Sequence, residues 1–212
     1  EVIYMYSFIA FWYEFVSEFV PFLIVLIGMR YVRGKYATPN TKSNYILPII
    51  FALYIMAVFY VTDVGTIYDA MTAELDEMKE RINWIPFSKS IDIVGYMLNI
   101  VMFVPFGFLV PLIWRKMGKT IYITIAGFGL SALIEISQLF SYRGTDVDDL
   151  IVNTLGAVLG FFLYKVWNKA TKSKFQLVDI DNVELLIYVL TLFLGRFLLF
   201  NRVGLIDLVY GY

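Results

Sequence analysis

The stretch SALIEISQLFSYRGTDVDDLIVNTLGA, residues 131–157, decides the fold of this chain. It joins two apolar segments through a short polar turn, and it sets three aspartates beside the second segment. Ser131, Glu135 and Gln138 recur at helical spacing, so they share one face of a helix. The stretch therefore predicts a helical hairpin whose first helix carries polar groups on an otherwise apolar pattern.

The composition of the 212-residue chain is that of an integral membrane protein. Hydrophobic residues make up 60% of the chain and charged residues only 17%, and the mean hydropathy is +0.73, far from an average soluble domain. Cysteine and histidine are absent, which excludes disulfides, Ser-His-Asp or Cys-His catalytic sites and most zinc sites. Any chemistry must therefore rest on carboxylates, hydroxyls, amides and cations.

Six segments are long and apolar enough for transmembrane helices, since about 20 residues cross a hydrocarbon core of about 30 Å. We therefore predict an all-α, polytopic membrane helix bundle that forms a single domain over residues 1–212. The predicted spans are residues 4–29, 45–64, 94–114, 121–140, 149–167 and 183–201.

Basic residues concentrate in every second connection between these spans. Most of the 17 lysines and arginines lie in residues 30–42, 115–119 and 165–174, which contain no acidic residue. The connections 63–92 and 141–149 are instead rich in aspartate and glutamate. Because basic connections stay on the cytoplasmic side, both termini and the two acidic connections are predicted to face outside.

An amphipathic helix is predicted at about residues 67–82, in the long acidic connection. Apolar residues recur there at intervals of three and four with acidic residues between them, namely Ile67, Met71, Leu75, Met78 and Ile82. This pattern is typical of a helix that lies along the membrane surface. A short helix packed on the bundle is the alternative.

Small residues predict where the fourth and fifth spans pack. The spacing is Gly127-x-x-x-Ser131 in the fourth span and Gly156-x-x-x-Gly160 in the fifth. Such pairs let helix backbones approach closely, and Asp149 and Asn153 share the face of the glycines in the fifth span. We therefore expect the small and polar faces of these two helices to face each other.

Carboxylates inside the spans need partners, because an ionised carboxylate that faces lipid is costly. Glu135 should be paired, hydrated or protonated, and Arg143 and Asn99 are the available partners. Alternatively, Glu135 serves only as an interhelical hydrogen-bonding group. In the first span, Glu14 and Glu18 share a face and are expected to flank a hydrated outer region.

Folding alone can explain part of the acidity in the 141–149 turn. Thr145-x-x-Asp148 is typical of a capping box that opens the fifth span. Asp148 and Asp149 also suit the positive N-terminal end of a helix. Arg143 and Asp146 can be explained as an ion pair that stabilises the turn.

Four blocks of residues follow one another along the chain. They are Asn83-x-x-Pro86-Phe87, Asn99-Ile-Val-Met-Phe-Val-Pro105-Phe-Gly107-Phe, Ser131-x-x-x-Glu135-x-x-Gln138 and Arg143-x-x-Asp146-x-Asp148-Asp149-x-x-x-Asn153-x-x-Gly156. In this order they resemble the signature of the VanZ-like membrane protein family. The resemblance covers about residues 45–167 and leaves the spans 4–29 and 183–201 as additions. It implies a multi-pass protein of the bacterial plasma membrane linked to resistance to the glycopeptide teicoplanin.

The residues that carry this resemblance fall at the predicted outer ends of the third, fourth and fifth spans. We predict a polar cavity there that opens to the outer leaflet and binds a lipid-linked envelope component, such as a peptidoglycan precursor, or a lipophilic glycopeptide. Arg143 would pair with a phosphate or carboxylate of the ligand, while Glu135 and Gln138 would form hydrogen bonds. The predicted ligand-binding residues are Glu135, Gln138, Arg143, Asp146, Asp149, Asn153 and Asn99.

Two other functions stay open. A metal-dependent membrane enzyme acting on a lipid headgroup or phosphate would hold a divalent cation at Asp146, Asp148 and Asp149, although we favour a role without catalysis or cofactor. A transporter of lipid or small solutes is the other alternative, and no inverted repeat supports it. The short basic connections fit anionic lipid headgroups and not nucleic acid.

Overall fold

The chain is described by a computed structural model over residues 2–34, 43–73, 82–88, 92–141, 144–171 and 181–210. Within these ranges it is helical, and the one β-type contact is an isolated bridge between Asn83 and Asp146. The elements are α1 (Val2–Gly34), α2 (Ser43–Thr62), α3 (Ile67–Thr72), α5 (Ile93–Ile113), the 3-10 turn η1 (Arg115–Met117), α6 (Thr120–Gln138), α7 (Val147–Ala170), α8 (Val183–Leu194), the π-helical η2 (Gly195–Leu199) and α9 (Arg202–Tyr210). The prediction of an all-α bundle is confirmed.

Five helical stretches in the described ranges are long and apolar enough to cross a membrane, and they correspond to α1, to α2 together with α3, and to α5, α6 and α7. The helices α1, α2, α5, α6 and α7 each coincide within a few residues with one of the first five predicted spans. The length of apolar sequence needed to cross a bilayer explains this agreement, because it leaves little freedom in where a span begins or ends.

The sixth predicted span, residues 183–201, is built differently. Its regular part, α8, has 12 residues and is continued by the five-residue π-helical η2. Gly195 starts η2, where an added Cβ would lie 2.5 Å from the main-chain oxygen of Ser17 in α1. Arg196 follows it and points its guanidinium toward α1. The segment where a sixth regular span was expected is therefore a short α-helix followed by a π-helical turn, which packs closely on α1 and carries a buried arginine.

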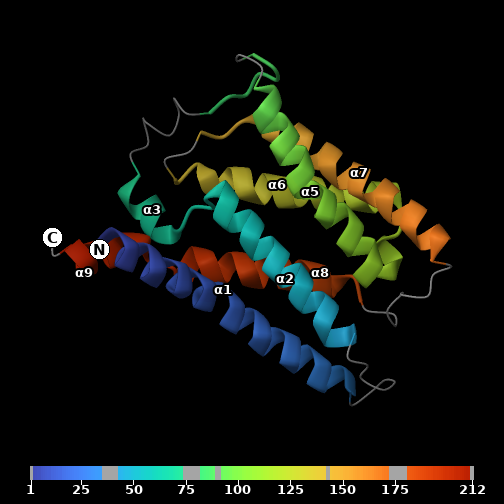
Figure 1. Cartoon of the computed structure of the whole chain (residues 1–212), viewed down its shortest axis with the longest axis horizontal. Helices are drawn as coiled ribbons and strands as arrows, with labels where there is room; N and C mark the ends of the chain where they lie inside the picture. Colours follow the sequence, from blue (N-terminus) through green and yellow to red (C-terminus); the bar gives the residue numbers. More distant parts are fainter. Residues whose placement is uncertain are drawn as a thin grey trace.

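The helices form two groups. α5, α6 and α7 pack together on one side, and α1, α2 and α8 pack together on the other (Figure 1). Trp114, which is fully buried after α5, joins them: its ring centroid lies 5.1 Å from that of Phe51 in α2 and 6.2 Å from that of Tyr188 in α8. The beginning of α1 and helix α9 lie at the same end of the bundle as α3 (Figure 1). The charge distribution of the connections predicts that this end faces outside.

Glycines set the distance between α5 and α7. A Cβ added at Gly156 would lie 2.3 Å from the main-chain oxygen of Ile100, and one added at Gly160 would lie 2.0 Å from that of Val104. These two glycines were expected to face α6, so this part of the packing prediction is wrong. Gly127 does fit the prediction, because an added Cβ there would lie 2.7 Å from the side chain of Ala157 in α7. α7 thus packs Gly156 and Gly160 on α5 and Ala157 on α6.

The predicted amphipathic helix at 67–82 is shorter than expected. α3 ends at Thr72, and Ala73 has extended backbone angles. Thr66 and Asp69 start α3 with a capping box, in which the Asp69 carboxylate accepts from the Thr66 amide at 2.8 Å. Residues 74–81 lie outside the described residues, and the chain is no longer helical at Ile82.

Candidate functional site

The α6–α7 hairpin brings two of the predicted site helices together through their polar faces. Asn153 Nδ2 of α7 donates to Ser131 Oγ of α6 at 3.0 Å, and both side chains are buried. This contact confirms that Ser131 and Asn153 face each other. The side-chain oxygen of Asn153 is buried and accepts no hydrogen bond from the described residues.

Glu135 fastens the turn of the hairpin to α6. Its carboxylate Oε2 accepts from the main-chain N–H of Asp146 at 3.0 Å, and its main-chain oxygen accepts from Thr145 Oγ1 at 3.0 Å. The side chain is 6% exposed, so the carboxylate sits inside the junction. Arg143, its predicted partner, lies outside the described residues. The other predicted partner, Asn99, binds Asp149 instead.

Asp146 starts α7 and holds the segment 82–88 in place. Its carboxylate caps the helix by accepting from the Asp148 amide at 3.0 Å. The same carboxylate accepts from Asn83 Nδ2 at 3.1 and 3.2 Å. Main-chain hydrogen bonds from Asn83 to Thr145 and from Val147 to Asn83 complete the contact. The segment that carries the first sequence block is therefore docked on the start of α7.

The predicted capping box of Thr145 and Asp148 is wrong, because Asp146 is the N-cap. Asp148 is 1% exposed and serves other donors: Oδ1 accepts from the Phe87 main-chain N–H at 2.8 Å, and Oδ2 accepts from Tyr96 Oη at 2.5 Å. A buried carboxylate with charge-assisted hydrogen bonds in fixed directions orders the groups around it. Asp148 thus ties the segment 82–88 and α5 to α7.

Asp149 and Gln138 extend the junction to neighbouring helices. Asn99 Nδ2 of α5 donates to Asp149 Oδ1 at 2.7 Å, and both residues are half-buried. Gln138 Nε2 donates to the main-chain oxygen of Thr62, at the end of α2, at 2.6 Å. Gln138 therefore faces α2 and not Asp149, and its buried Oε1 accepts no hydrogen bond from the described residues.

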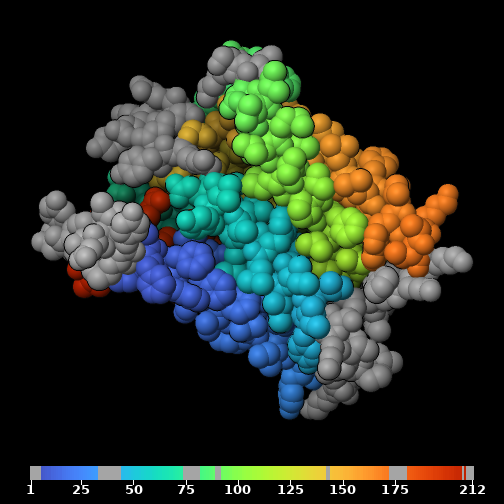
Figure 2. Space-filling model, viewed as in Figure 1, coloured from blue at the N-terminus to red at the C-terminus, as the bar shows by residue number. Residues whose placement is uncertain are grey.

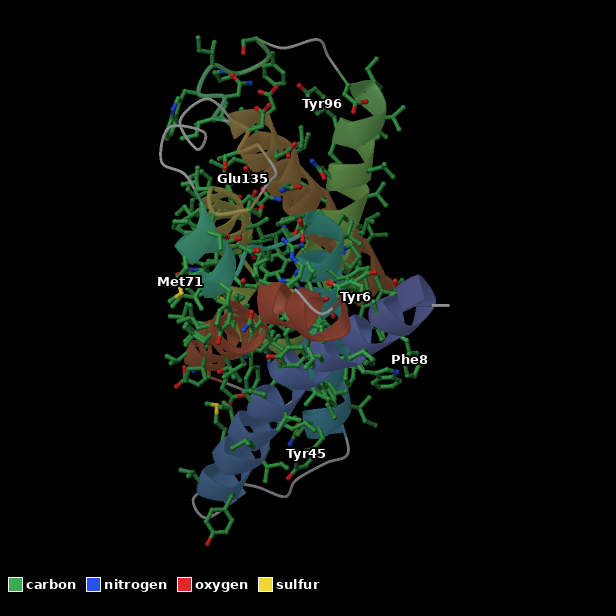
Figure 3. The ribbon with its side chains drawn as sticks, turned by 90° about the vertical axis from the view of Figure 1, so that its left-hand side faces the viewer. Tyr6, Phe8, Tyr45, Met71, Tyr96 and Glu135 are labelled. Carbon is green, nitrogen blue, oxygen red and sulfur yellow. The ribbon has the colours of Figure 1, made fainter. Side chains whose placement is uncertain are left out.

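Together these contacts make one polar junction. We use this name for Asn83, Tyr96, Asn99, Ser131, Glu135, Gln138, Asp146, Asp148, Asp149 and Asn153. Figure 3 looks at the end of the bundle that bears α3 and shows Glu135 and Tyr96 in its upper part, apart from Tyr6 and Met71. Within the polar junction, the carboxylates of Glu135 and Asp148 are buried. Asp146, Asp149 and Asn99 are only half-buried.

The three aspartates considered as metal ligands use separate partners. Asp146 binds Asn83, Asp148 binds Tyr96, and Asp149 binds Asn99. Over the described residues, no three Asp, Glu, His or Cys side chains come together in an arrangement that could hold a metal ion. The junction is suited to recognising hydrogen-bond donors and cations through oxygen acceptors.

A second polar group, absent from the sequence-based prediction, lies between α1, η2 and α9. Arg196 contacts Glu14 and Glu18, with Glu18 Oε1 at 3.3 Å from Nη1, and donates from Nε to the main-chain oxygen of Val64 at 2.7 Å. The arginine and both glutamates are buried, so these carboxylates meet a cation inside the bundle. The signal that could have revealed the pairing is a cation in one apolar span and two acids in another.

Arg202 extends this group toward α3. Its Nη1 lies 3.0 Å from Asp63 Oδ1 and its Nη2 lies 3.1 Å from Asp69 Oδ1. Asp63 also lies 3.9 Å from Arg196, which joins the two arginines through one carboxylate. The charge cluster is defined as Glu14, Glu18, Asp63, Asp69, Arg196 and Arg202.

Comparison with known proteins relates the middle of the chain to a described family. The family model VanZ/LLP1 matches residues 51–168. Protein VanZ of Enterococcus faecium is 27% identical over 149 residues, which cover 68% of this chain and 87% of that protein. No solved structure matches the chain. The family match runs from α2 to the last turns of α7 and includes the whole polar junction, whereas α1, α8, η2 and α9 lie outside it.

Proposed function

Because the chain belongs to the VanZ/LLP1 family, whose model matches more than half of it, we propose that it is a bacterial plasma-membrane protein that protects the cell against lipophilic glycopeptides such as teicoplanin. The membrane assignment has direct support from the five stretches that are long and apolar enough to span a bilayer. Glycopeptides act on peptidoglycan precursors outside the membrane, so the protective site belongs at the outer end of the bundle.

The polar junction is the proposed binding site. The observation that carries this proposal is the convergence of residues from four separate stretches of the chain, the segment 82–88, α5, α6 and α7, on one end of the bundle. Stable helix packing in a membrane needs small residues and a few hydrogen bonds. A junction with four carboxylates exceeds that need, and polar groups of this kind in membrane helices are commonly functional.

The ligand would be a lipid-linked envelope component or the lipophilic glycopeptide itself. Its polar end would meet Asp146, Asp149 and Asn99, the half-buried members of the junction, and Arg143 would pair with its phosphate or carboxylate. Glu135 and Asp148 would act as positioning residues, because their carboxylates hold the turn and the segment 82–88. The buried Oε1 of Gln138 and Oδ1 of Asn153 are acceptors that a ligand donor could use.

The test is glycopeptide susceptibility of a sensitive host that expresses the full chain. We expect the unmodified protein to raise the inhibitory concentration of teicoplanin, and we expect Glu135→Gln and Arg143→Ala to remove that protection at unchanged membrane levels. Arg115→Ala is the matched control, because Arg115 is exposed at the opposite end of the bundle. Full protection by both junction variants would overturn the proposal.

A further inference from the structure

A groove between α1 and α2 combines an apolar half with a charged half. The two helices lie side by side on the face shown in Figure 2. The apolar half is a cavity of about 250 Å³ and the charged half one of about 450 Å³. Both are lined by Phe11, Glu14, Tyr60 and Val61, so the two cavities adjoin. An amphiphilic molecule could place different parts in the two halves.

Among the described residues, the carboxylates of the charge cluster beside this groove outnumber its cations. The charge cluster contains four carboxylates but only two guanidinium groups, those of Arg196 and Arg202. Both arginines are already engaged by carboxylates and hold little capacity for an additional anion. The surplus of acceptors therefore favours a ligand that brings a positive charge.

The carboxylate of Glu18 marks the place where a positively charged group of a ligand would bind. Its side chain is 1% exposed and lines the apolar half of the groove. Oε1 accepts from Arg196, whereas Oε2 is buried and has no hydrogen-bond partner among the described residues. A buried carboxylate oxygen without a donor is costly, and Glu14, one helical turn away, lines the same cavity. A cation with N–H donors placed between them would relieve that cost.

The side chains that line the cavity next to Glu18 are mostly apolar and suit an apolar molecule. Phe11, Phe15, Leu53 and Met56 line the cavity, and Tyr60 completes it toward the charged half. Aromatic rings attract cations through their faces, and the apolar side chains exclude water around the carboxylates. An ammonium group on an apolar body matches both features.

We propose that the α1–α2 groove binds a lipophilic primary amine, whose ammonium group donates to Glu18 Oε2 and Glu14 and whose apolar body lies between Phe11, Phe15, Leu53 and Met56. The groove is separate from the polar junction, since no residue of the junction lines either of its two cavities. It therefore forms a second site, which stands independently of the proposed protective function.

The test is equilibrium binding to the purified full chain in phosphatidylcholine nanodiscs. Dansylcadaverine serves as the probe, because it is a lipophilic primary amine whose fluorescence rises in apolar surroundings. Its N-acetylated derivative keeps the apolar body and removes the positive charge. We expect saturable binding of the amine and no saturable binding of the acetylated probe.

Two variants examine the two parts of the site. Glu18→Gln should weaken amine binding roughly tenfold or more, since a charge-assisted hydrogen bond is lost. Leu53→Trp should block the apolar half without changing any charge, and it keeps the test decisive if Glu18→Gln folds poorly. Asp92→Asn is the matched control, because it removes an exposed carboxylate from the start of α5.

Three results would overturn the proposal. The first is equal saturable binding of both probes, which would show that the ammonium group is not recognised. The second is amine binding that is unchanged in both Glu18→Gln and Leu53→Trp. The third is the absence of saturable amine binding to the unmodified chain, which would mean that a proton alone satisfies Glu18.

Discussion

The polar junction and the charge cluster lie at the same end of the bundle, but Asp148 in the junction and the buried carboxylates of the cluster have different kinds of partner. In the junction, Asp148 accepts hydrogen bonds from the Phe87 main-chain N–H and from the Tyr96 hydroxyl. In the charge cluster, Glu14, Glu18 and Asp69 meet arginines. Neutral donors fix a carboxylate by direction, whereas guanidinium groups also compensate its charge.

This difference suggests different roles for the polar junction and the charge cluster. The junction is built from the family-matched segment and keeps oxygen acceptors in set positions, as the proposed binding site requires. The cluster connects α1, η2 and α9, which lie outside the match, to Asp63 and Asp69 inside it. We therefore expect the charge cluster to respond more strongly in stability and the junction to respond more strongly in glycopeptide protection.

The largest stability effect is expected for Arg196→Ala. The substitution leaves Glu14 and Glu18 buried without their cation, which costs roughly 3 to 5 kcal/mol when one partner of a buried pair is removed. Unfolding of the purified protein in detergent measures the loss. Adding Glu14→Gln and Glu18→Gln to the same chain should recover part of it, because the unpaired charges disappear. A loss below about 1 kcal/mol for Arg196→Ala would show that Arg196 does not compensate the charges of Glu14 and Glu18.

An intermediate effect is expected for Asp148→Asn in the junction. It removes the charge from hydrogen bonds to Phe87 N–H and Tyr96 Oη, and hydrogen bonds to charged groups contribute about 1.5 to 3 kcal/mol. The double-mutant cycle with Tyr96→Phe, followed by the same unfolding measurement, isolates the Tyr96 contact. Strictly additive effects of the two substitutions would contradict a direct bond between these side chains.

The smallest stability effect is expected for Arg202→Gln. Arg202 and Asp63 are 29% and 36% exposed, and partly exposed ion pairs contribute about 1 kcal/mol or less. Asp69, the buried partner of Arg202, keeps its hydrogen bonds from the main-chain N–H and hydroxyl of Thr66. The loss should shrink further in high salt, because salt screens exposed pairs far more than buried ones. Unfolding at low and high ionic strength measures this dependence, with Arg196→Ala as the comparison whose loss should change little. An equal salt dependence of both variants would remove the distinction drawn here.

Most of the bundle could be predicted from the sequence because hydropathy and helical spacing are local properties. The five spans and the Ser131–Asn153 contact follow from patterns within one or two helices. The π-helical η2 could not be predicted in this way, since it depends on Gly195 meeting the backbone of α1. The length of the apolar segment 183–201 alone predicted a regular sixth transmembrane helix.

The partners of the site residues were harder to predict, because they depend on which segments meet in space. Gln138 binds a main-chain oxygen, which carries no sequence signal. Asp148 resembles a capping residue in sequence, yet Tyr96, 52 positions away, takes its carboxylate. Arg196 and Glu14 are 182 positions apart. The need to pair charges inside a membrane predicts that such partners exist, but it does not identify them.

The central claim is that the polar junction faces the outside of the cell, and thiol labelling tests it most directly. The chain has no cysteine, so Ile85→Cys, a position 67% exposed in the segment docked on the junction, introduces a single thiol. Lys119→Cys, exposed at the opposite end, is the control. In intact cells, we predict that a membrane-impermeant maleimide labels the Ile85→Cys protein and labels the Lys119→Cys protein only after permeabilisation. The reverse pattern would contradict the account.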